Sequence, residues 1–471
     1  MNALPASLVT AISAVGQSEV LRFYDALDAA GRGRLRAQLE SIDWDQIPRL
    51  CHLAASAGSP AEAAGADFTS RLANAVTPPC LTLGGPTAET TAAIGRRALA
   101  LGHIGAVLVA GGQGSRLGCQ GPKGVVPVGP VSGASLFDIL LGKLRAVRRR
   151  HGAHVPLAIM TSSATDADTK TWLREHDHGG LDPEQVLVFR QSDLPALDAT
   201  SGKILLDAPD RIAMAPDGHG GMLPALVAAG GLEWFAARGC RDVVTFQVDN
   251  PLTMPLHPEF LGHHIGQAAD FSTQVVRKHQ PGERVGIVAT SAGRTFVVEY
   301  SDLPANLAAE RRPDGLLRFH AGSIAVHAFA LDFLNRAAAA ADPLPLHLAR
   351  KSVPHLTPDG QRVVPAQPNA IKFERFIFDL MPLAERVCLV EIDPAEGFAP
   401  LKNPPGAAAD AIEHVQAALV AHARGLLAKG GICVADAVVV ELDSASILDE
   451  DDIRAAVPPG SRIDSPRLIG G

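Results

Sequence analysis

The sequence VLVAGGQGSRLG at residues 107–118, followed by GPKG at residues 121–124, is an apolar strand that runs into a glycine-rich turn. Glycine lets the backbone approach a ligand closely, and successive backbone N–H groups in such a turn bind anions. Arg116 and Lys123 add cations that suit a polyphosphate. We therefore predict a phosphate-binding loop at the carboxyl end of a buried strand.

Two familiar phosphate-loop fingerprints do not fit this stretch. A dinucleotide-binding loop needs a third glycine or an alanine where this chain has Leu117. A P-loop is excluded because Pro122 precedes Lys123, and because Gly124 occupies the position of the P-loop serine or threonine. The spacing therefore argues against a nicotinamide-dependent oxidoreductase.

Residues 99–385 alternate short apolar runs with helical patterns, which is typical of an α/β domain with a mostly parallel sheet. The clearest predicted strands are rich in valine and isoleucine: Ile104–Val109, Leu157–Met160, Val186–Phe189 and Val243–Val248. A later pair of short runs, Gly286–Ala289 and Thr295–Glu299, flanks a turn and predicts a hairpin. We expect this segment to be the catalytic core.

Residues 1–98 are predicted to form a helical N-terminal region. Apolar side chains recur there at helical spacing: Val20, Leu21, Tyr24, Leu27, Leu35 and Leu39. Gly31 and Gly33 interrupt this pattern, so we expect the helix to break there. The region is interpreted as a packing domain.

Residues 386–471 are predicted to form a small α+β C-terminal domain. A helix that includes Ile412 and Val415 is expected to end at Gly430, and Val438–Leu442 is expected to follow as a strand. The acidic run at residues 449–452 is interpreted as a solvated face and not as a metal site.

Composition limits the possible functions further. The chain has 471 residues, of which 47% are hydrophobic, with a formal net charge of −8 and no basic block, so we expect no nucleic-acid partner. Six scattered cysteines without a C-x-x-C pair argue against a disulfide framework or a zinc site. The first residues lack a signal-peptide pattern, and no apolar stretch has the length of a spanning helix. We expect a soluble, cytoplasmic protein with no membrane partner.

The glycine-rich stretch resembles the signature of UTP-dependent sugar-1-phosphate uridylyltransferases, and the nearest branch is that of the UDP-N-acetylhexosamine pyrophosphorylases. The similarity begins at Gly16 and Gln17 and continues to about Asn403, so it covers most of the chain. It implies a Rossmann-like nucleotidyltransferase core with a mixed, mostly parallel sheet. It also implies that the partners are UTP and a sugar 1-phosphate, while the oligomeric state stays open.

The resemblance implies a nucleotide site built from three loops. Its residues are Ala110, Gly111, Gly112, Gly114, Gln191, Gly218 and Gly220. Gln191 follows a predicted strand, and a glutamine amide can satisfy both a carbonyl and an N–H of a pyrimidine edge. The resemblance implies that Gln191 contacts uracil.

Asp249 is the predicted metal ligand. It lies just past the carboxyl end of an apolar strand, where open α/β sheets gather their ligands. A hard carboxylate there suits Mg²⁺, which binds one or two carboxylates together with substrate phosphates. The resemblance implies catalytic roles for Arg116 and Lys123 on the leaving pyrophosphate, and for Lys402 between the two substrates.

The expected sugar side departs from the family pattern. The resemblance implies contacts from four residues: His219, Glu299, Ser323 and Lys372. The N-acetylhexosamine enzymes usually carry asparagine at the position of His219, and the family pattern has asparagine at the positions of Ser323 and Val326. These changes leave open which sugar the pocket accepts.

The predicted reaction is uridylyl transfer from UTP to a sugar 1-phosphate, which gives a UDP-sugar and pyrophosphate. Both reactants are charged phosphates, so no protein nucleophile is needed and catalysis rests on positioning and charge neutralisation. N-acetylglucosamine 1-phosphate is the favoured substrate, and glucose 1-phosphate or a broad range of sugars is the alternative. A non-catalytic relative that binds UDP-sugars is a further alternative.

Overall fold

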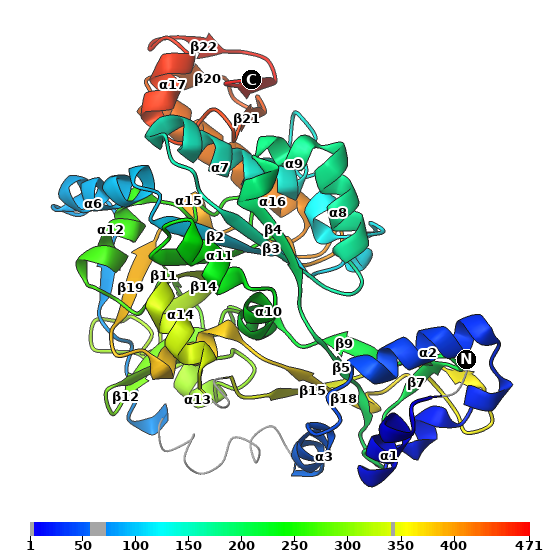
Figure 1. Ribbon diagram of the computed structural model, residues 1–471. Coiled ribbons are helices and arrows are strands. Elements are labelled where there is room, and N and C mark those ends of the chain that lie inside the picture. The colour runs from blue at the N-terminus through cyan, green and yellow to red at the C-terminus, as the bar shows by residue number, and fades with distance from the viewer. Residues whose placement is uncertain (1–3, 57–71, 341–343) are drawn as a thin grey trace. The chain divides into compact units, whose positions relative to one another are not determined.

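The computed structural model describes residues 4–56, 72–340 and 344–471 (Figure 1). The chain forms two compact units. The small unit combines three stretches of chain, Met1–Ala73, Ser192–Gly221 and Leu344–Ile377. The large unit contains the other three stretches: Asn74–Gln191, Met222–Pro343 and Phe378–Gly471.

A mixed sheet forms the centre of the large unit. Its strands, in spatial order, are β1 (Cys80–Thr82), β19 (Val387–Ile392), β11 (Phe271–Arg277), β14 (Ala321–Ala330), β10 (Asp242–Gln247), β2 (Ile104–Val109), β3 (Leu157–Thr161) and β4 (Val186–Arg190). Only β14 runs antiparallel to its two neighbours along this order. The prediction of a mixed, mostly parallel sheet is therefore confirmed.

The predicted strands of the core are confirmed within one or two residues at their ends. The predicted hairpin is also present, as β12 (Ile287–Ser291) and β13 (Arg294–Val298). Its two turn residues, Ala292 and Gly293, have φ of +49° and +73°. Positive φ at both central residues matches the right-handed twist of the flanking strands.

Helices cover both faces of this sheet. Gly105 of β2 lies against Phe235 of α11 (Gly231–Ala237), since a Cβ at Gly105 would lie 2.5 Å from that ring. Leu108 instead joins the apolar core that contains Phe137 of α7 (Leu136–His151). Because successive residues of a strand point to opposite faces, positions 105 and 108 place α11 and α7 on opposite faces of the sheet.

The large unit contains further helices before its C-terminal part. They are α6 (Ala88–Ala100), α8 (Asp166–Glu175), α9 (Asp177–Gly180), α10 (Met222–Ala228), α12 (Pro258–Gly266), α13 (Ala305–Ala308), α14 (Leu331–Ala338) and α15 (Pro394–Gly397). Helix α6 packs along α12, while α10, α11 and α14 pack together (Figure 1). Gly262 permits the close approach of α12, because a Cβ there would lie 1.8 Å from the Thr91 carbonyl of α6.

The C-terminal part has its own apolar core, which includes Leu427, Val440 and Ile453. The predicted helix and strand are confirmed: α16 (Ile412–Lys429) ends at Gly430, and β21 (Val440–Leu442) follows. The remaining elements of this part are β20 (Cys433–Val434), α17 (Glu450–Ala456), β22 (Arg462–Ile463) and β23 (Arg467–Ile469).

The prediction that the acidic run at 449–452 is a solvated face is wrong for two of its members. Asp449 and Asp452 both bind Arg150 of α7 as ion pairs. Asp449 also accepts hydrogen bonds from the backbone N–H groups of Asp451 and Asp452, so it caps α17. A cationic partner from a distant helix and the capping role hold these carboxylates in place.

The small unit joins helices to short strands. Its helices are α1 (Ala6–Ala14), α2 (Ala29–Ser41) and α3 (Ile47–Ser56). Its strands are β5 (Asp193–Pro195), β6 (Leu197–Asp198), β7 (Leu206–Ala208), β8 (Arg211–Ile212), β9 (Met214–Pro216), β15 (His347–Lys351), β16 (His355–Leu356), β17 (Arg362–Val363) and β18 (Ala370–Glu374). Strands β15, β18 and β6 form a three-stranded sheet, whose Ile371 and Phe373 share an apolar core with Leu35 and Leu39 of α2.

The predicted break at Gly31 and Gly33 is wrong, because α2 continues through both glycines. Asp28 caps this helix by accepting a hydrogen bond of 2.7 Å from the Gly31 backbone N–H. A Cβ at Gly31 would lie 3.1 Å from the Asp28 carboxylate, so glycine makes room for the cap. The chain before the cap forms short 3₁₀ turns, Ser18–Leu21 and Tyr24–Ala26, instead of an α-helix.

Among the described residues, no single helix is long and apolar enough to cross a membrane. One bent pair, His219–Ala228 with Gly231–Ala237 at 70°, meets the requirement by length and composition only. All six cysteines are free thiols. The described part of the chain contains no group of three or more His, Cys, Asp or Glu side chains able to hold a metal.

Candidate functional site

The glycine-rich loop after β2 folds back on itself in the large unit. The Gly114 N–H donates to the Gly121 carbonyl and the Lys123 N–H donates to the Gly112 carbonyl, both at 2.9 Å. Gly121 has φ of +102°, which an L-amino acid with a side chain rarely adopts. The loop is therefore a short backbone-bonded hairpin that returns Lys123 beside the end of the strand.

The glycines of this loop have different tasks. A Cβ at Gly124 would lie 2.2 Å from the Phe137 ring, so this glycine lets the loop pack on α7. A Cβ at Gly114 would lie 3.1 Å from the Cys119 Cβ, which also indicates close packing. A Cβ at Gly112 would meet nothing within 4 Å. Gly112 thus keeps the backbone accessible from an open cleft.

This cleft has a volume of about 1220 Å³ and is lined by residues of the large unit alone. Its walls come from the glycine-rich loop, from residues 282–285 with Tyr300, and from residues 398–410. Lys123 and Lys402 both line it, although 278 residues separate them in sequence. The fold therefore brings two of the predicted catalytic cations to one cavity.

Lys123 connects the predicted metal ligand to the segment that carries Lys402. Its Nζ donates a hydrogen bond of 2.9 Å to the Leu401 carbonyl and lies 3.8 Å from the Asp249 Oδ2. The Leu401 N–H in turn donates to the Asp249 backbone carbonyl at 2.8 Å. The Lys123 and Asp249 side chains keep 17% and 14% of their surface exposed, so both charges are partly desolvated and strongly felt by a bound phosphate.

Asn250 has a structural role that the sequence analysis missed. Its amide donates to the Gly397 carbonyl at 2.8 Å and accepts from the Ala399 N–H at 3.0 Å, and the residue is 4% exposed. A single buried side chain therefore ties the turn after β10 to the segment before Lys402. An asparagine directly after a strand-end aspartate was the signal available in the sequence.

The segment after Lys402 closes into a loop. The backbone N–H groups of Lys402 and Asn403 both donate to the Asp410 carbonyl, at 2.8 and 2.9 Å. The Lys402 side chain is exposed at the cleft. Two backbone hydrogen bonds thus fix the point on the cleft wall from which the flexible Lys402 side chain extends.

Gln191 lies beside the glycine-rich loop. It follows β4, is 5% exposed, and its side-chain amide makes no hydrogen bond within the described residues. A Cβ at Gly111 would lie 2.9 Å from the Gln191 Oε1, so glycine at 111 permits this approach. Ala110 precedes that glycine and donates its N–H to the Met160 carbonyl of β3 at 2.8 Å. A buried amide without a partner is suited to a ligand that has both a donor and an acceptor.

Glu299 and Ser323, two of the predicted sugar contacts, approach the same glycine. The Ser323 N–H donates to the Gly286 carbonyl at 2.8 Å, and a Cβ at Gly286 would lie 3.1 Å from the Glu299 Oε1. The Ser323 Oγ is buried without a hydrogen-bond partner among the described residues. Val326 is 1% exposed in the apolar core, so that departure from the family pattern is absorbed by packing.

The second glycine loop, residues 217–221, belongs to the small unit. A Cβ at Gly218 would lie 2.5 Å from the Arg375 carbonyl, and one at Gly220 would lie 2.5 Å from the Phe376 nitrogen. The Asp217 side chain is 1% exposed and pairs with Arg375 at 3.1 Å. Burial raises the pKa of Asp217 to about 6, while Arg375 acts in the opposite direction.

His219 stacks on Phe376, with 5.2 Å between ring centroids and 24° between ring planes. Its Nδ1 lies 3.2 Å from the Ile377 backbone N–H, which donates to it. Burial and the nearby His347 lower the pKa of His219 to about 4. The ring is therefore neutral at pH 7, with its proton on Nε2.

The last two predicted site residues are Lys372 and Arg116. Lys372 is the central residue of β18, between Ile371 and Phe373. Those two neighbours are 0% and 1% exposed in the core, so Lys372 lies on the other face of the small sheet. Arg116 belongs to a 3₁₀ turn, Ser115–Leu117, and its side chain lies outside the part of the molecule that the structure describes.

Known proteins similar to this chain share this architecture. The chain is 37% identical over 428 residues to UDP-N-acetylhexosamine pyrophosphorylase-like protein 1 of Mus musculus, covering 88% of this chain and 84% of that protein. It is 36% identical over 359 residues to UDP-N-acetylglucosamine pyrophosphorylase of Saccharomyces cerevisiae, covering 74% and 75% of the two chains. A crystal structure of a UDP-N-acetylglucosamine pyrophosphorylase from Entamoeba histolytica, described as putative, matches with a TM-score of 0.77 and 29% identity, covering 83% of this chain and 99% of that chain.

Residues 88–407 match the family described as UTP–glucose-1-phosphate uridylyltransferase. This match spans the glycine-rich loop, Asp249 and Lys402. The resemblance stated from the sequence is therefore confirmed. The chain belongs to the UTP–glucose-1-phosphate uridylyltransferase family, whose members are pyrophosphorylases that make UDP-sugars.

Proposed function

We propose that this protein transfers the uridylyl group of UTP to N-acetylglucosamine 1-phosphate. The observation that carries the proposal is the arrangement of Lys123, Asp249 and Lys402 around the glycine-rich loop of one cleft. The mouse and yeast relatives, named for UDP-N-acetylhexosamine and UDP-N-acetylglucosamine, support this choice of sugar.

The reaction needs no proton transfer. A phosphate oxygen of the sugar 1-phosphate attacks the α-phosphorus of UTP, and the bond from that phosphorus to the β-phosphate oxygen breaks. The backbone N–H groups of the glycine-rich loop and the Lys123 ammonium bind the departing pyrophosphate, and we assign the same task to Arg116. Lys402 offsets charge between the two substrates, and Gln191 binds the uracil edge. Positioning and charge neutralisation together supply the rate enhancement.

Enzymes of this kind generally use a divalent metal, and we propose Mg²⁺. Asp249 offers one partly exposed carboxylate, and the described residues offer no cage of three ligand side chains. This donor set fits Mg²⁺, which keeps several waters and takes its other ligands from substrate phosphates. When bound, the ion neutralises phosphate charge at the reacting phosphorus.

Glucose 1-phosphate, or a broader range of sugars, is the second candidate substrate. Ser323 has a shorter side chain than the asparagine of the family pattern, and its buried Oγ lacks a protein partner among the described residues. A pocket with one small donor near Glu299 makes fewer contacts to an N-acetyl group. We infer that discrimination between the two sugars is weaker than the family pattern implies.

Pyrophosphate release from UTP and Mg²⁺ across a panel of sugar 1-phosphates tests the proposal. The panel contains N-acetylglucosamine, N-acetylgalactosamine, glucose and galactose 1-phosphates, and Asp249→Ala is the inactive control. Release with N-acetylglucosamine 1-phosphate that is lost in the variant supports the proposal. If none of the four sugar 1-phosphates gives pyrophosphate release while the protein still binds UTP, the proposal is contradicted. That result would favour a non-catalytic relative that binds UDP-sugars.

A further inference from the structure

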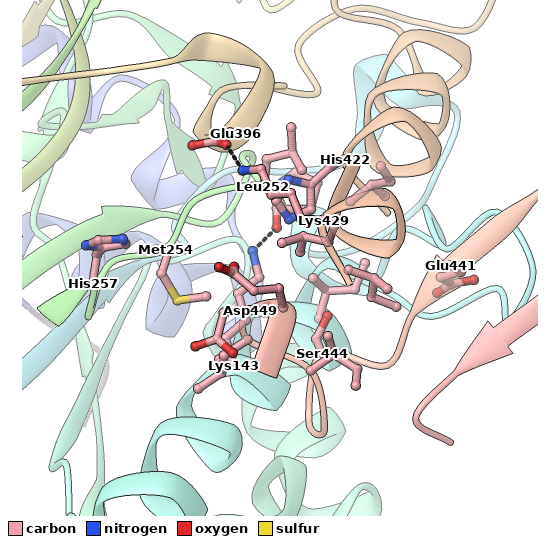
Figure 2. Close-up of a pocket in the computed structure, with 18 residues that line it drawn as sticks. Lys143, Leu252, Met254, His257, Glu396, His422, Lys429, Glu441, Ser444 and Asp449 are labelled. Atoms are coloured by element: carbon pink, nitrogen blue, oxygen red, sulfur yellow. Dashed lines mark hydrogen bonds and ion pairs between the residues drawn. The ribbon is translucent and has the colours of Figure 1, made fainter. Parts of the chain in front are cut away.

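A second cavity, of about 240 Å³, lies within the large unit (Figure 2). Its walls come from α7, from the loop of residues 251–257, from α15 and α16, and from residues 441–450. It shares no lining residue with the larger cleft. A ligand of this cavity would therefore be bound by residues other than those that line the larger cleft.

Lys143 reaches this cavity from α7 and lacks an anionic partner. Its Nζ donates to the Pro251 and Thr253 carbonyls at 2.6 and 2.7 Å, and no carboxylate of the described residues lies within ion-pair distance. Burial lowers the pKa of Lys143 to about 7. A buried ammonium group without a counter-ion is costly, and two carbonyl dipoles compensate it only in part.

Two histidines add hydrogen-bond capacity that the protein does not use. His422 of α16 makes no hydrogen bond within the described residues, and burial followed by the charge of Lys143 lowers its pKa to about 4. His257 also lines the cavity, and its Nδ1 is buried without a hydrogen-bond partner among the described residues. Both imidazoles are neutral at pH 7, so each can offer an N–H to a ligand.

Most carboxylates of the lining are already bound. Glu396 pairs with Lys429 at 2.8 Å, as Figure 2 shows, and Asp449 binds Arg150. Glu441 accepts from the Val131 and Ser132 backbone N–H groups, each at 2.7 Å.

Glu450, at the start of α17, is the one lining carboxylate without a hydrogen bond or ion pair among the described residues, and its charge helps to raise the pKa of Lys429. Each neutral imidazole also keeps an acceptor nitrogen, and Glu450 is an acceptor. The feature that favours an anion is therefore Lys143, whose buried ammonium group has no carboxylate partner among the described residues.

Most of the remaining wall is apolar, and Ser444 is its other polar residue. The apolar residues are Ile139, Pro251, Leu252, Met254, Leu419, Leu426, Leu442, Ile447 and Leu448. A fully hydrated inorganic ion would leave these side chains without contacts, whereas a short hydrocarbon chain would remove them from water. The cavity thus places the unpaired Lys143 beside an apolar wall, while Lys429, the other lysine of the lining, pairs with Glu396.

We propose that this cavity binds a small organic anion, whose carboxylate pairs with Lys143 and whose hydrocarbon part contacts the apolar wall. The site lies directly behind the turn of Asp249 and Asn250, since the carbonyls that hold Lys143 belong to the next residues along the chain. The ligand is a molecule other than UTP or a sugar phosphate, so the proposal is independent of the proposed reaction.

Thermal unfolding of the full chain with three six-carbon probes tests the site: hexanoate, hexylammonium and 1-hexanol. At ten times its Kd, hexanoate is expected to raise the Tm by about 1–2 °C for a chain of this size, and the other two probes less. Lys143→Met, which keeps an unbranched apolar side chain, is expected to lose the hexanoate shift. Lys170→Met, which changes an exposed side chain of α8, is the matched control and is expected to keep the shift.

Leu419→Trp provides a second test, because the larger ring fills the cavity while Lys143 stays in place. This variant is expected to lose the hexanoate shift as well, and it decides the question if Lys143→Met does not fold. An equal shift with hexylammonium, or a hexanoate shift that persists in either cavity variant, would overturn the proposal. The readout needs no uridylyl transfer, so its failure is separate from a failure of the proposed function.

Discussion

The two glycine loops, residues 111–124 of the large unit and 217–221 of the small unit, look alike in sequence and differ in structure. In the first, Gly112 has open space where a Cβ would be. In the second, a Cβ at Gly218, Gly220 or Gly221 would lie 1.9 to 2.5 Å from another atom. At Gly112 the first loop, here called the open loop, exposes backbone to a cleft, although its Gly124 also packs on Phe137. The second loop, here called the packed loop, uses all three of these glycines for close packing. A glycine-rich motif therefore signals close backbone approach without saying to what.

The largest expected effect concerns the cation of the open loop. Lys123→Met is expected to lower kcat/KM for pyrophosphate release by about 10²–10³-fold, because we propose that the ammonium next to Asp249 stabilises developing phosphate charge. The measurement is a steady-state assay with UTP and N-acetylglucosamine 1-phosphate. Lys170→Met is the control and is expected to keep full activity. A loss of less than about fivefold would place Lys123 outside the reaction.

A substitution in the packed loop is expected to change the stability of the protein more than its activity. Gly220→Ala is expected to lower the free energy of unfolding by about 3 kcal/mol, since the added methyl group would lie 2.5 Å from the Phe376 backbone nitrogen. Urea unfolding followed by circular dichroism measures the change. An alanine variant as stable as the wild type would mean that the Arg375–Phe376 backbone moves freely, and the contrast between the loops would fail.

Asp217 gives the packed loop a pH signature. Burial raises its pKa to about 6, above the unfolded value near 3.8, so the folded chain holds this proton more tightly than the unfolded chain. The contribution of Asp217 to the free energy of unfolding is therefore fully present below about pH 4. It is lost as pH rises through 6, which lowers the free energy of unfolding by about 3 kcal/mol.

The pKa of the neighbouring His219 is lowered, so its effect on stability has the opposite pH dependence. Comparison with Asp217→Asn, which keeps His219, isolates the contribution of Asp217. The measurement is the free energy of unfolding from urea titrations between pH 4 and pH 7. The wild type should lose stability relative to the variant over this range. Parallel profiles would show that the pKa of Asp217 is the same in the folded and unfolded chains.

Local patterns were sufficient to predict the open loop. The apolar run before Ala110 predicted β2 with its observed ends, and the glycines that follow predicted the turn. The role of Asn250 could not be predicted in this way, because its partners Gly397 and Ala399 lie 147 and 149 residues further along the chain. The amide of such a residue serves equally well in a local turn.

Local sequence patterns also failed to predict two other features. Gly31 and Gly33 were expected to interrupt a helix, but the Asp28 cap and the buried Leu35 and Leu39 outweigh the low helix propensity of glycine. The sequence analysis did not single out Lys143. Segments that lie far along the chain surround it: its Nζ donates to the Pro251 and Thr253 carbonyls, and α16 forms another wall of the same cavity. Long-range tertiary contacts, and not local propensity, determine both outcomes.

Gly112→Ala is the matched partner of the packed-loop variant. Its methyl group would project into open space, so the free energy of unfolding is expected to change by less than about 0.5 kcal/mol. The KM for UTP is expected to rise about fivefold, because the side chain would occupy the approach to the loop N–H groups. Steady-state kinetics with varied UTP measures this change. Unchanged KM together with unchanged stability would show that the triphosphate binds elsewhere.

The smallest expected effect tests whether the packed loop also reads a substrate. His219→Asn introduces the residue usual in N-acetylhexosamine enzymes, and an asparagine carbonyl can replace Nδ1 as acceptor for the Ile377 N–H. Loss of the stacking on Phe376 is expected to cost about 1 kcal/mol of stability. The ratio of kcat/KM for N-acetylglucosamine 1-phosphate over glucose 1-phosphate is expected to rise about fivefold, with the KM for UTP constant. If the KM for UTP changes while the sugar ratio stays fixed, the loop contacts the nucleotide and the sugar preference must come from Glu299 and Ser323 alone.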